Sequence, residues 1–247
     1  MKVVAVYSVK GGVGKTSAAV NLAWHASRKR RTLVWDLDPQ GGATYLLEVR
    51  PRTKGSAHAL VRGKADLGDV VRTTDDKRLD VVPAHDSYRE LDIELDGTKH
   101  PDRQLDKLLG DVAKRYDVVI LDCPPGMSLL SEAILAAADV VVVPLVPSPL
   151  SMRSLDQVTA MVAATRRPRP RIVGFLSMVD RRKTIHRDLV ATLPETSKHV
   201  LPVVVPASTI VERMGVERAP VAAFAPRSVP AAAYRELWKG VAAALDR

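Results

Sequence analysis

The sequence has very little cysteine and few aromatic residues. Cys123 is the single cysteine in 247 residues, so the chain can form no internal disulfide and no metal site built on a pair of cysteines. A reducing, cytoplasmic setting is therefore expected. Aromatic residues make up only 4% of the chain, whereas hydrophobic residues make up 46%. Alanine and valine carry much of this apolar content, which favours tightly packed helices on a valine-rich sheet.

Long apolar runs are also missing. The first run, VVAVYSV, is too short for the core of a signal peptide and leads directly into Lys10. The most apolar later stretch, AILAAADVVVVPLV, is interrupted by Asp139 and Pro144, so it does not predict a membrane span. The sequence shows no internal repeat and no low-complexity linker. We therefore expect a soluble protein with one domain over residues 1–247.

Negative charge is scarce relative to positive charge. Lys and Arg number 37 against 28 Asp and Glu, which gives a net charge of +9 and a pI of about 9.8. Two interpretations remain open at this point. The surface is basic throughout without a specific purpose, or the protein has a polyanionic partner such as nucleic acid or an anionic membrane.

Short β-branched runs alternate with stretches of helical spacing. Near-continuous apolar strands are typical of a parallel sheet that is covered on both faces. One helix is predicted to begin at Ser148 and Pro149 and to present apolar residues on one face from Met152 to Val162. The alternation predicts an α/β protein with a single doubly wound, mostly parallel sheet and helices on both faces. The runs are KVVAVYS, TLVWDLD, LDVVPA, DVVILDC, DVVVVPL, RIVGFLSMV and VLPVVVP.

The stretch SVKGGVGKTS, residues 8–17, lies between a predicted strand and a predicted helix, which is the context of a phosphate-binding P-loop. Its glycines let the backbone curl so that successive N–H groups point at phosphate oxygens, and the helix N-terminus adds partial positive charge. Lys15 is expected to reach the β- and γ-phosphates, and the Thr16 hydroxyl to ligate Mg²⁺. We therefore predict ATP and Mg²⁺ as cofactors, with nucleotide contacts from Gly11, Gly12, Val13, Gly14, Lys15, Thr16 and Ser17.

The loop departs from the general pattern G-x-x-x-x-G-K-[ST], because Val9 stands at the first glycine position and Lys10 follows it. In this respect it resembles the deviant Walker A loop, K-G-G-x-G-K-[ST], of the ParA/MinD family of ATPases. The resemblance extends over essentially the whole chain. In that family the extra lysine reaches across a nucleotide-sandwich dimer to the phosphates of the other subunit. The resemblance therefore implies an ATP-dependent homodimer and a catalytic role for Lys10 beside Lys15.

Aspartates follow two of the predicted strands. The stretch VWDLDPQGGAT places Asp36 and Asp38 two residues apart, and so on the same side of an extended chain. It is similar to the family pattern D-x-D-P-Q-G-x-x-T, which implies that Asp38 positions or deprotonates the attacking water and that Asp36 lies nearer Mg²⁺. In VVILDCPPG, Asp122 takes the Walker B position and would hold Mg²⁺ through water. Cys123 is interpreted as a small buried residue beside the site, and residues 124–126 resemble the second switch loop.

Two further expectations concern the residues that contact adenine and the rate of ATP hydrolysis. The family places adenine between segments that follow the last strands, here SMVDRR and VVVPAS, which makes Met178, Asp180 and Pro206 the candidates; residues at strand ends with no ligand are the alternative. An isolated subunit lacks its partner's Lys10, and phosphoryl transfer depends on positioning and charge neutralisation. Weak basal ATPase activity is therefore expected.

The stretch from Arg166 to Arg187 holds eight Lys or Arg against one acid, Asp180. It predicts either a solvated face or a surface for the phosphate backbone of nucleic acid. Many ParA-type proteins bind DNA non-specifically as ATP dimers. However, the segment after Pro206 lacks the arginines that chromosomal members commonly carry directly after this proline. The candidate DNA contacts are Arg181, Arg182, Lys183, Arg187, Arg213 and Arg218.

The resemblance implies a cytoplasmic, nucleoid-associated ParA-type ATPase that positions or segregates a plasmid, a chromosome region or a protein assembly. A ParB-like or cargo-linked adaptor would stimulate its slow hydrolysis. The alternative is a MinD-like, membrane-cycling ATPase for division-site or polar placement. The C-terminal stretch PAAAYRELWKGVAAALDR has a helical apolar stripe, but Gly240 and its alanines favour a packed terminal helix over a membrane anchor. The absence of a second cysteine argues against an iron–sulfur relative.

Overall fold

The described part of the chain, residues 1–50, 55–165 and 168–247 of a computed structural model, places its strands in one eight-stranded sheet. The strand order is β3-β4-β2-β5-β1-β6-β7-β8, and β3 is antiparallel to β4 while all other pairs are parallel. This confirms the predicted α/β class and mostly parallel sheet. The strands are β1 Lys2–Val6, β2 Thr32–Asp36, β3 Arg72–Thr73, β4 Leu79–Val82, β5 Val118–Asp122, β6 Val140–Leu145, β7 Arg171–Val179 and β8 Val200–Pro206.

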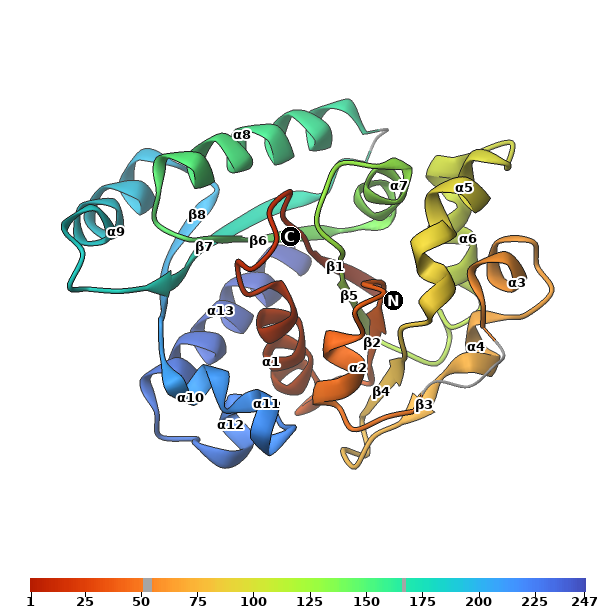
Figure 1. The fold of residues 1–247 in the computed structure, drawn as a ribbon, viewed down its shortest axis with the longest axis horizontal. Coiled ribbons are helices and arrows are strands. Elements are labelled where there is room, and N and C mark those ends of the chain that lie inside the picture. Colours follow the sequence, from red (N-terminus) through yellow and green to blue (C-terminus); the bar gives the residue numbers. More distant parts are fainter. Residues whose placement is uncertain (51–54, 166–167) are drawn as a thin grey trace.

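Helices surround the sheet on both faces (Figure 1). Short 3-10 helices, η1 at Asp86–Glu90 and η2 at Pro101–Arg103, precede α5 and α6. The α-helices are α1 Lys15–Ser27, α2 Gly42–Leu46, α3 Ala57–Val61, α4 Leu67–Val70, α5 Leu91–Asp96, α6 Gln104–Gly110, α7 Leu129–Ala137, α8 Pro149–Ala164, α9 Thr184–Thr196, α10 Thr209–Glu212, α11 Met214–Glu217, α12 Val221–Phe224 and α13 Val229–Leu245.

Alternate side chains of each central strand enter two different cores. In β1, Val3 and Ala5 belong to the core beneath α3 to α9, whereas Val4 and Val6 belong to the core beneath α1, α2 and α11 to α13. This alternation follows from the two-residue period of a strand. Because both faces are covered, the strands had to be apolar at almost every position.

The order of the strands reverses at β1, since β1 lies between β5 and β6 while β2 and β4 continue on one side and β7 and β8 on the other. Ligands of doubly wound proteins bind at the carboxyl ends of the strands near such a reversal. The fold therefore places the loop after β1 at the expected ligand-binding edge.

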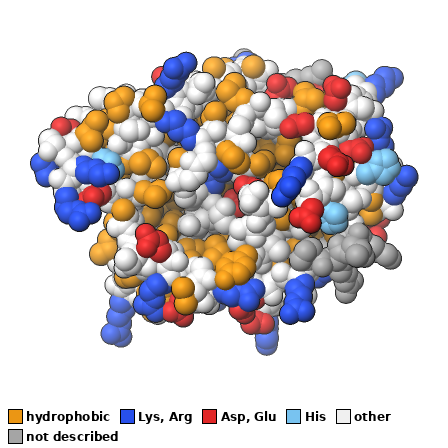
Figure 2. Space-filling view, in the orientation of Figure 1, with side chains coloured by type: hydrophobic (Ala, Val, Ile, Leu, Met, Phe, Trp, Pro, Cys, Tyr) orange, Lys and Arg blue, Asp and Glu red, His pale blue; other side chains and the backbone are white. Residues whose placement is uncertain are grey.

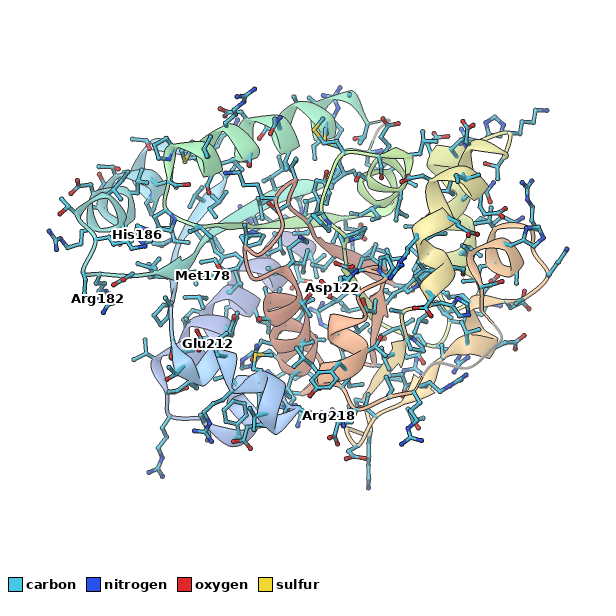
Figure 3. All side chains as sticks on the ribbon, in the orientation of Figure 1. Asp122, Met178, Arg182, His186, Glu212 and Arg218 are labelled. Carbon is cyan, nitrogen blue, oxygen red and sulfur yellow. The ribbon has the colours of Figure 1, made fainter. Side chains whose placement is uncertain are left out.

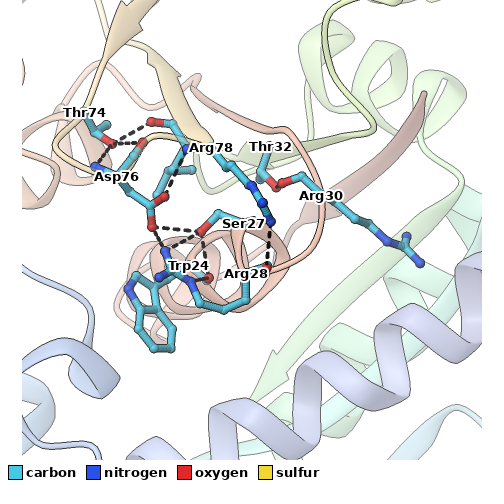
Figure 4. Close-up of polar contacts among 9 residues, drawn as sticks. Trp24, Ser27, Arg28, Arg30, Thr32, Thr74, Asp76 and Arg78 are labelled. Atoms are coloured by element: carbon cyan, nitrogen blue, oxygen red, sulfur yellow. Dashed lines mark hydrogen bonds and ion pairs between the residues drawn. The ribbon is translucent and has the colours of Figure 1, made fainter.

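Four basic residues, RKRR at positions 28–31, follow α1, and the first of them caps the C-terminal end of this helix. Arg28 donates from Nε to the Trp24 carbonyl at 3.2 Å, stacks over the Trp24 ring and pairs with Asp76. Arg78 donates to the Arg28 carbonyl at 3.0 Å, and Figure 4 shows this network around the last turn of α1. Cations at a helix C-terminus satisfy free carbonyls and oppose the helix dipole.

The C-terminal helix α13 packs into the core as predicted. Leu237 and Val241 are fully buried, and Leu245 is nearly so. Gly240 allows close contact with β8, because a Cβ at this position would lie 2.3 Å from Leu201 Cδ1. Within the described residues, no helix is both long enough and apolar enough to cross a membrane.

All the predicted β-branched runs contain strands, and the helix predicted from Pro149 is α8. The two-residue strand β3 was not predicted, because a strand this short carries no apolar pattern of its own. It lies within residues 50–78, a segment that also contains α3 and α4. Residues 51–54 of this segment lie outside the described residues.

Candidate nucleotide-binding site

The glycine-rich loop joins the end of β1 to the start of α1. Gly12 and Gly14 have φ values of 69° and 90°, in the left-handed region that favours glycine. Gly14 is also confined, because a Cβ there would lie 3.0 Å from Ser177 Oγ. Ser177, at the other side of the loop, donates its hydroxyl to the Val13 carbonyl at 2.9 Å. The loop conformation is therefore held by glycine geometry and by one buried serine on β7.

The first turn of α1 faces a pocket of about 270 Å³. The backbone N–H groups of Lys15, Thr16 and Ser17 donate to no group in the described residues, as expected for the first turn of a helix. These free donors make a ready site for an anion. The pocket is lined by Gly11, Gly12, Gly14, Lys15, Thr16, Ser17, Asp38 and Pro125, whereas the Val13 side chain is buried in the core.

Lys15 is held inside this pocket. Its side chain is only 6% exposed, and Nζ donates to the Lys10 carbonyl at 3.1 Å. Burial lowers the pKa of Lys15, and the nearby Asp122 carboxylate partly opposes that change. The ammonium group has three donors and uses one of them here. Two donors of a desolvated cation thus remain for an anionic ligand.

Lys10 differs from Lys15 in where its charge lies. Its backbone is fixed, since its N–H donates to Ser8 Oγ at 3.3 Å and its carbonyl accepts from Lys15. Its ammonium forms no hydrogen bond or ion pair with any residue that the structure describes, and Lys10 is not among the residues that line the pocket. The Lys10 charge is therefore free beside a pocket that it does not enter.

Asp36 and Asp122 stand side by side at the carboxyl ends of β2 and β5, where they are register partners. Both side chains are fully buried. Neither carboxyl oxygen of Asp122 has a hydrogen-bond partner in the part of the chain that the structure describes. Burial raises the pKa of Asp122 strongly, and the neighbouring Asp36 adds to this effect. A buried carboxyl without partners is costly, so this group is suited to a cation or to water held by one.

Asp36 is already engaged by the protein. Its Oδ2 accepts from the Thr44 N–H at 2.8 Å and from the Thr44 hydroxyl at 2.7 Å. The same hydroxyl accepts from the Ala84 N–H at 2.8 Å. Burial raises the pKa of Asp36 to about 6, although these hydrogen bonds lower it. Asp36 thus anchors α2 through Oδ2, while its Oδ1 accepts from the Asp38 N–H at 3.3 Å. Thr44 is the last residue of the stretch VWDLDPQGGAT, but the sequence analysis gave it no role.

Replacing Thr44 with valine should destabilise the protein. The change leaves Asp36 Oδ2 with one donor and the buried Ala84 N–H with none, which costs about 1–3 kcal/mol. The free energy of unfolding from urea titrations measures this loss. Thr44→Ser keeps the hydroxyl and should retain most of the stability. Equal stability of the valine variant and the wild type would contradict the bridging role of Thr44.

Asp38 follows β2 in the loop before α2. Its Oδ1 accepts from the Gln40 N–H at 2.9 Å, its carbonyl accepts from the Gly41 N–H, and its side chain lines the pocket. Asp38 is half-buried. The structure therefore places Asp38 and Lys15 among the residues that line one pocket, whereas Asp122 is fully buried and is not among them.

The loop after β5 is fastened to the glycine-rich loop. The Gly126 N–H donates to the Val9 carbonyl at 3.0 Å, and the buried Tyr7 hydroxyl donates to the Gly126 carbonyl at 2.6 Å. Cys123 is fully buried, and burial raises the pKa of its thiol. This agrees with its interpretation as a small core residue beside the site.

The candidate adenine contacts lie at the ends of β7 and β8. Val179 pairs with Pro206, so the two segments run side by side. Met178 is 44% exposed and has a φ of 54°, which is unusual for a residue other than glycine. Asp180 is occupied, since its carboxylate binds the Arg182 guanidinium through two contacts of 2.9 Å. Met178 and Pro206 are therefore free at this edge, whereas Asp180 is not.

The candidate DNA contacts fall into two separate groups. Arg181, Arg182, Lys183 and Arg187 lie at the start of α9, where Figure 2 shows Lys and Arg side chains gathered at one end of the molecule. Figure 3 shows Arg182 in this group and Arg218 at a different side, beside α11 and α2. Arg166 and Arg167, at the start of the basic stretch, lie outside the described residues.

The second group is engaged in contacts within the chain. Arg213 pairs with Glu217 and stacks over Phe224. Arg218 donates to the Tyr45 carbonyl at 3.2 Å, pairs with Glu48 at 3.3 Å and stacks over the Tyr45 ring. Because α2 follows Asp38 in the chain, Arg218 also holds the segment that carries a candidate catalytic residue. No sequence pattern pointed to this contact.

The chain is similar to known proteins along most of its length. The family described as AAA domain matches residues 1–172. The sporulation initiation inhibitor protein Soj of Bacillus subtilis (strain 168) is 32% identical over 252 residues, with 98% of each chain covered. The chromosome partitioning protein ParA of Myxococcus xanthus (strain DK1622) is 32% identical over 212 residues, with 83% of this chain and 75% of that protein covered.

A similar fold is found among solved structures. The cobyrinic acid a,c-diamide synthase of Mycobacterium smegmatis, with a bound ATP analogue and magnesium, has a TM-score of 0.80 and 26% identity over 98% of this chain and 94% of that one. Together with the sequence matches, the parallel sheet and the loop after β1 place this protein in a family. The chain belongs to the ParA/MinD family of P-loop ATPases.

Proposed function

We propose that this protein is a ParA-type ATPase that forms an ATP-sandwich dimer, binds DNA non-specifically and positions or segregates a cargo by slow hydrolysis. The chain is similar to Soj over 98% of its length and to a chromosome partitioning protein ParA. These similarities support a role in partition rather than the amide-forming activity for which the Mycobacterium smegmatis synthase is named. We place its action in the cytoplasm, on the nucleoid, with a ParB-like or cargo-linked adaptor as the stimulating partner.

The pocket fits ATP and Mg²⁺. Its free N–H groups and the Lys15 ammonium suit phosphate oxygens, and the unpartnered Asp122 carboxylate with the Thr16 hydroxyl suits a magnesium ion and its water. Among residues 1–50, 55–165 and 168–247, no group of three or more His, Cys, Asp or Glu is placed so that protein side chains alone could hold a metal ion. Mg²⁺ usually binds one or two carboxylates together with substrate phosphates, so the donor set is adequate. When bound, Mg²⁺ would neutralise charge on the phosphates.

The main observation that supports an ATP-dependent dimer is the free ammonium of Lys10. A lysine that lay in its own pocket would compete with Lys15, whereas Lys10 lies outside it and has no partner in the described chain. Two chains that face each other at their carboxyl edges can each supply this charge to the other's nucleotide. Asp38 then positions or deprotonates the attacking water, and hydrolysis waits for the second chain.

Lys10→Ala tests this proposal. The variant should bind ATP with the affinity of the wild-type monomer, because Lys15 and the backbone donors are unchanged. It should lose ATP-dependent dimerisation, because the charge given to the partner's phosphates is gone. Analytical ultracentrifugation with and without Mg-ATP measures both states. Lys99→Ala, which removes an exposed lysine elsewhere, is the control, and normal dimerisation of Lys10→Ala would refute the proposal.

Non-specific DNA binding is assigned to the start of α9. Arg181, Arg182 and Lys183 are exposed, Arg182 while paired with Asp180, and a dimer would present two such groups. Replacing these three residues with alanine should weaken binding of the ATP-bound protein to DNA and reduce its salt dependence, because fewer phosphate contacts release fewer counterions. Basal hydrolysis should not change. A mobility shift at two salt concentrations measures this.

The matched control removes three cations far from this group, Arg89, Lys99 and Lys114, each also exposed. Equal loss of DNA affinity in both variants would show that only net charge matters, which would contradict the assignment. A MinD-like membrane cycle is not favoured, because the apolar stripe of α13 is used in the core at Leu237 and Val241.

A further inference from the structure

Three loops at the amino-terminal edge of the sheet carry adjacent basic residues. The loops precede β2, β4 and β5, and they contain RKRR at positions 28–31, KR at 77–78 and KR at 114–115. These strands are neighbours in the order β4-β2-β5 and run parallel to one another. Their amino ends therefore share one edge, and basic residues that are far apart in the chain come together there.

Backbone hydrogen bonds fix the three loops to each other. The Thr32 N–H donates to the Arg78 carbonyl at 2.8 Å, and the Asp117 N–H donates to the Arg31 carbonyl at 2.8 Å. Asp117 also accepts from the Arg31 N–H at 2.8 Å through Oδ2. The base of this basic cluster therefore belongs to the ladder of the sheet.

A pocket of about 230 Å³ lies between these loops. This volume is below the roughly 300–1,000 Å³ of pockets for drug-sized ligands, so the pocket suits a small ion or the charged end of a larger molecule. Among the described residues, four cations and one acid line it, and this excess of positive charge favours an anion. The lining residues are Arg31, Lys77, Arg78, Asp80, Arg115 and Tyr116.

Asp80 does not neutralise these cations. Its Oδ2 accepts from the hydroxyl of the buried Tyr116 at 2.6 Å, and it forms no ion pair with any Lys or Arg in the described part of the chain. Burial raises the pKa of Tyr116, and the contact with Asp80 raises it further, so the phenol keeps its proton and remains the donor. The acid of the pocket is thus occupied by a neutral group.

Arg78 and Arg115 are held in place but keep most of their donors. Arg78 donates from Nη1 to the Arg28 carbonyl at 3.0 Å, as Figure 4 shows. Arg115 donates from Nη1 to the Gly68 carbonyl at 3.5 Å and stacks over the Tyr116 ring. A guanidinium group has five N–H donors. Both side chains are therefore oriented by the protein and still able to bind an oxyanion.

Arg31 and Lys77 bring charges that the chain does not use. Both are exposed, and neither side chain forms a hydrogen bond or an ion pair with residues 1–50, 55–165 or 168–247. Like charges that are held together repel one another and destabilise the folded chain. A bound anion would remove this repulsion.

We propose that this pocket binds a phosphate group with at least two negative charges, such as the end of a small phosphomonoester or diphosphate. The guanidinium groups of Arg78 and Arg115 match phosphate oxygens in geometry, and Lys77 adds a point charge. The pocket lies at the amino ends of the strands, whereas the nucleotide pocket lies at the carboxyl end of β1. Both sites can therefore be filled at once.

The test titrates inorganic pyrophosphate into the nucleotide-free, ¹⁵N-labelled full chain at constant ionic strength. Amide chemical shifts of residues 31, 77–80 and 115–117 should change in a saturable way. Pyrophosphate is also expected at the glycine-rich loop, but residues 11–17 report on that site separately. Each site thus gives its own dissociation constant, and failure at one leaves the other unaffected.

Lys77→Glu combined with Arg115→Glu should weaken binding at the amino edge by about tenfold or more. The shifts of residues 11–17 should stay as in the wild type, which also shows that the variant is folded. Arg89→Glu with Lys99→Glu makes the same change of charge at exposed positions outside the pocket. This control should bind like the wild type.

Asp80→Asn should bind pyrophosphate more tightly, by about two- to fivefold. The change removes the negative charge of the pocket, while the amide oxygen can still accept from the Tyr116 hydroxyl. Loss of folding cannot produce such a gain in affinity.

Unchanged amides at the amino edge, equal losses in the two charge-reversal variants, or weaker binding by Asp80→Asn would each overturn the proposal. So would a short DNA duplex that shifts these amides while pyrophosphate does not, because the edge would then serve a nucleic acid backbone.

Discussion

Lys15→Gln is expected to abolish useful ATP binding. Lys15 is the buried cation of the pocket, and its two free donors face the space lined by the glycine loop. Removing one partner of a desolvated, hydrogen-bonded charge pair costs about 2–5 kcal/mol, and every 1.4 kcal/mol is about a tenfold change in affinity. Isothermal titration with Mg-ATP should therefore show a loss of at least about thirtyfold.

The variant is expected to fold, because the glutamine amide can still donate toward the Lys10 carbonyl that Lys15 contacts. Lys99→Gln changes an exposed lysine outside the pocket and serves as the control. Wild-type affinity in a folded Lys15→Gln protein would remove the assignment of this loop as the phosphate site.

Asp38→Ala is expected to retain ATP binding and to lower the hydrolysis rate by about 10²–10³-fold. Asp38 lines the pocket, and the loss of a positioned general base typically costs a factor of this size. The phosphate contacts of Lys15 and the loop amides are unchanged, so the ATP-bound form should accumulate. Single-turnover hydrolysis measures the chemical step directly.

Asp38→Asn separates chemistry from loop geometry. Asn can still accept from the Gln40 N–H that Asp38 holds at 2.9 Å, but it carries no negative charge. If Asp38 acts on the water, both variants should be equally slow. Wild-type turnover in Asp38→Asn would mean that Asp38 only shapes its loop.

Much of this molecule could be predicted because its signals are local in the sequence. Each central strand is a β-branched run that is apolar on both faces, and the order strand, glycine loop, helix is contiguous from Lys2 to Ser27. Asp36 and Asp122 could also be placed at one edge, because the carboxyl ends of parallel strands share an edge.

What could not be predicted depends on contacts between residues far apart in the chain. The bond from Thr44 to the Ala84 N–H and the contact of Arg218 with Tyr45 join segments separated by 40 and 173 residues. Composition and periodicity do not specify such partners. The pairing of Asp180 with Arg182 is local, but the sequence did not show that it would occupy a carboxylate considered for adenine.

The clearest measurement is the molar mass of the Asp38→Ala protein saturated with Mg-ATP, determined by light scattering across a range of protein concentrations. A positively charged side chain offered by each chain to the triphosphate of the other predicts a particle of twice the 26.9 kDa of one chain. Without nucleotide, the mass should return to that of a single chain. A single-chain mass with Mg-ATP at every concentration would contradict the account.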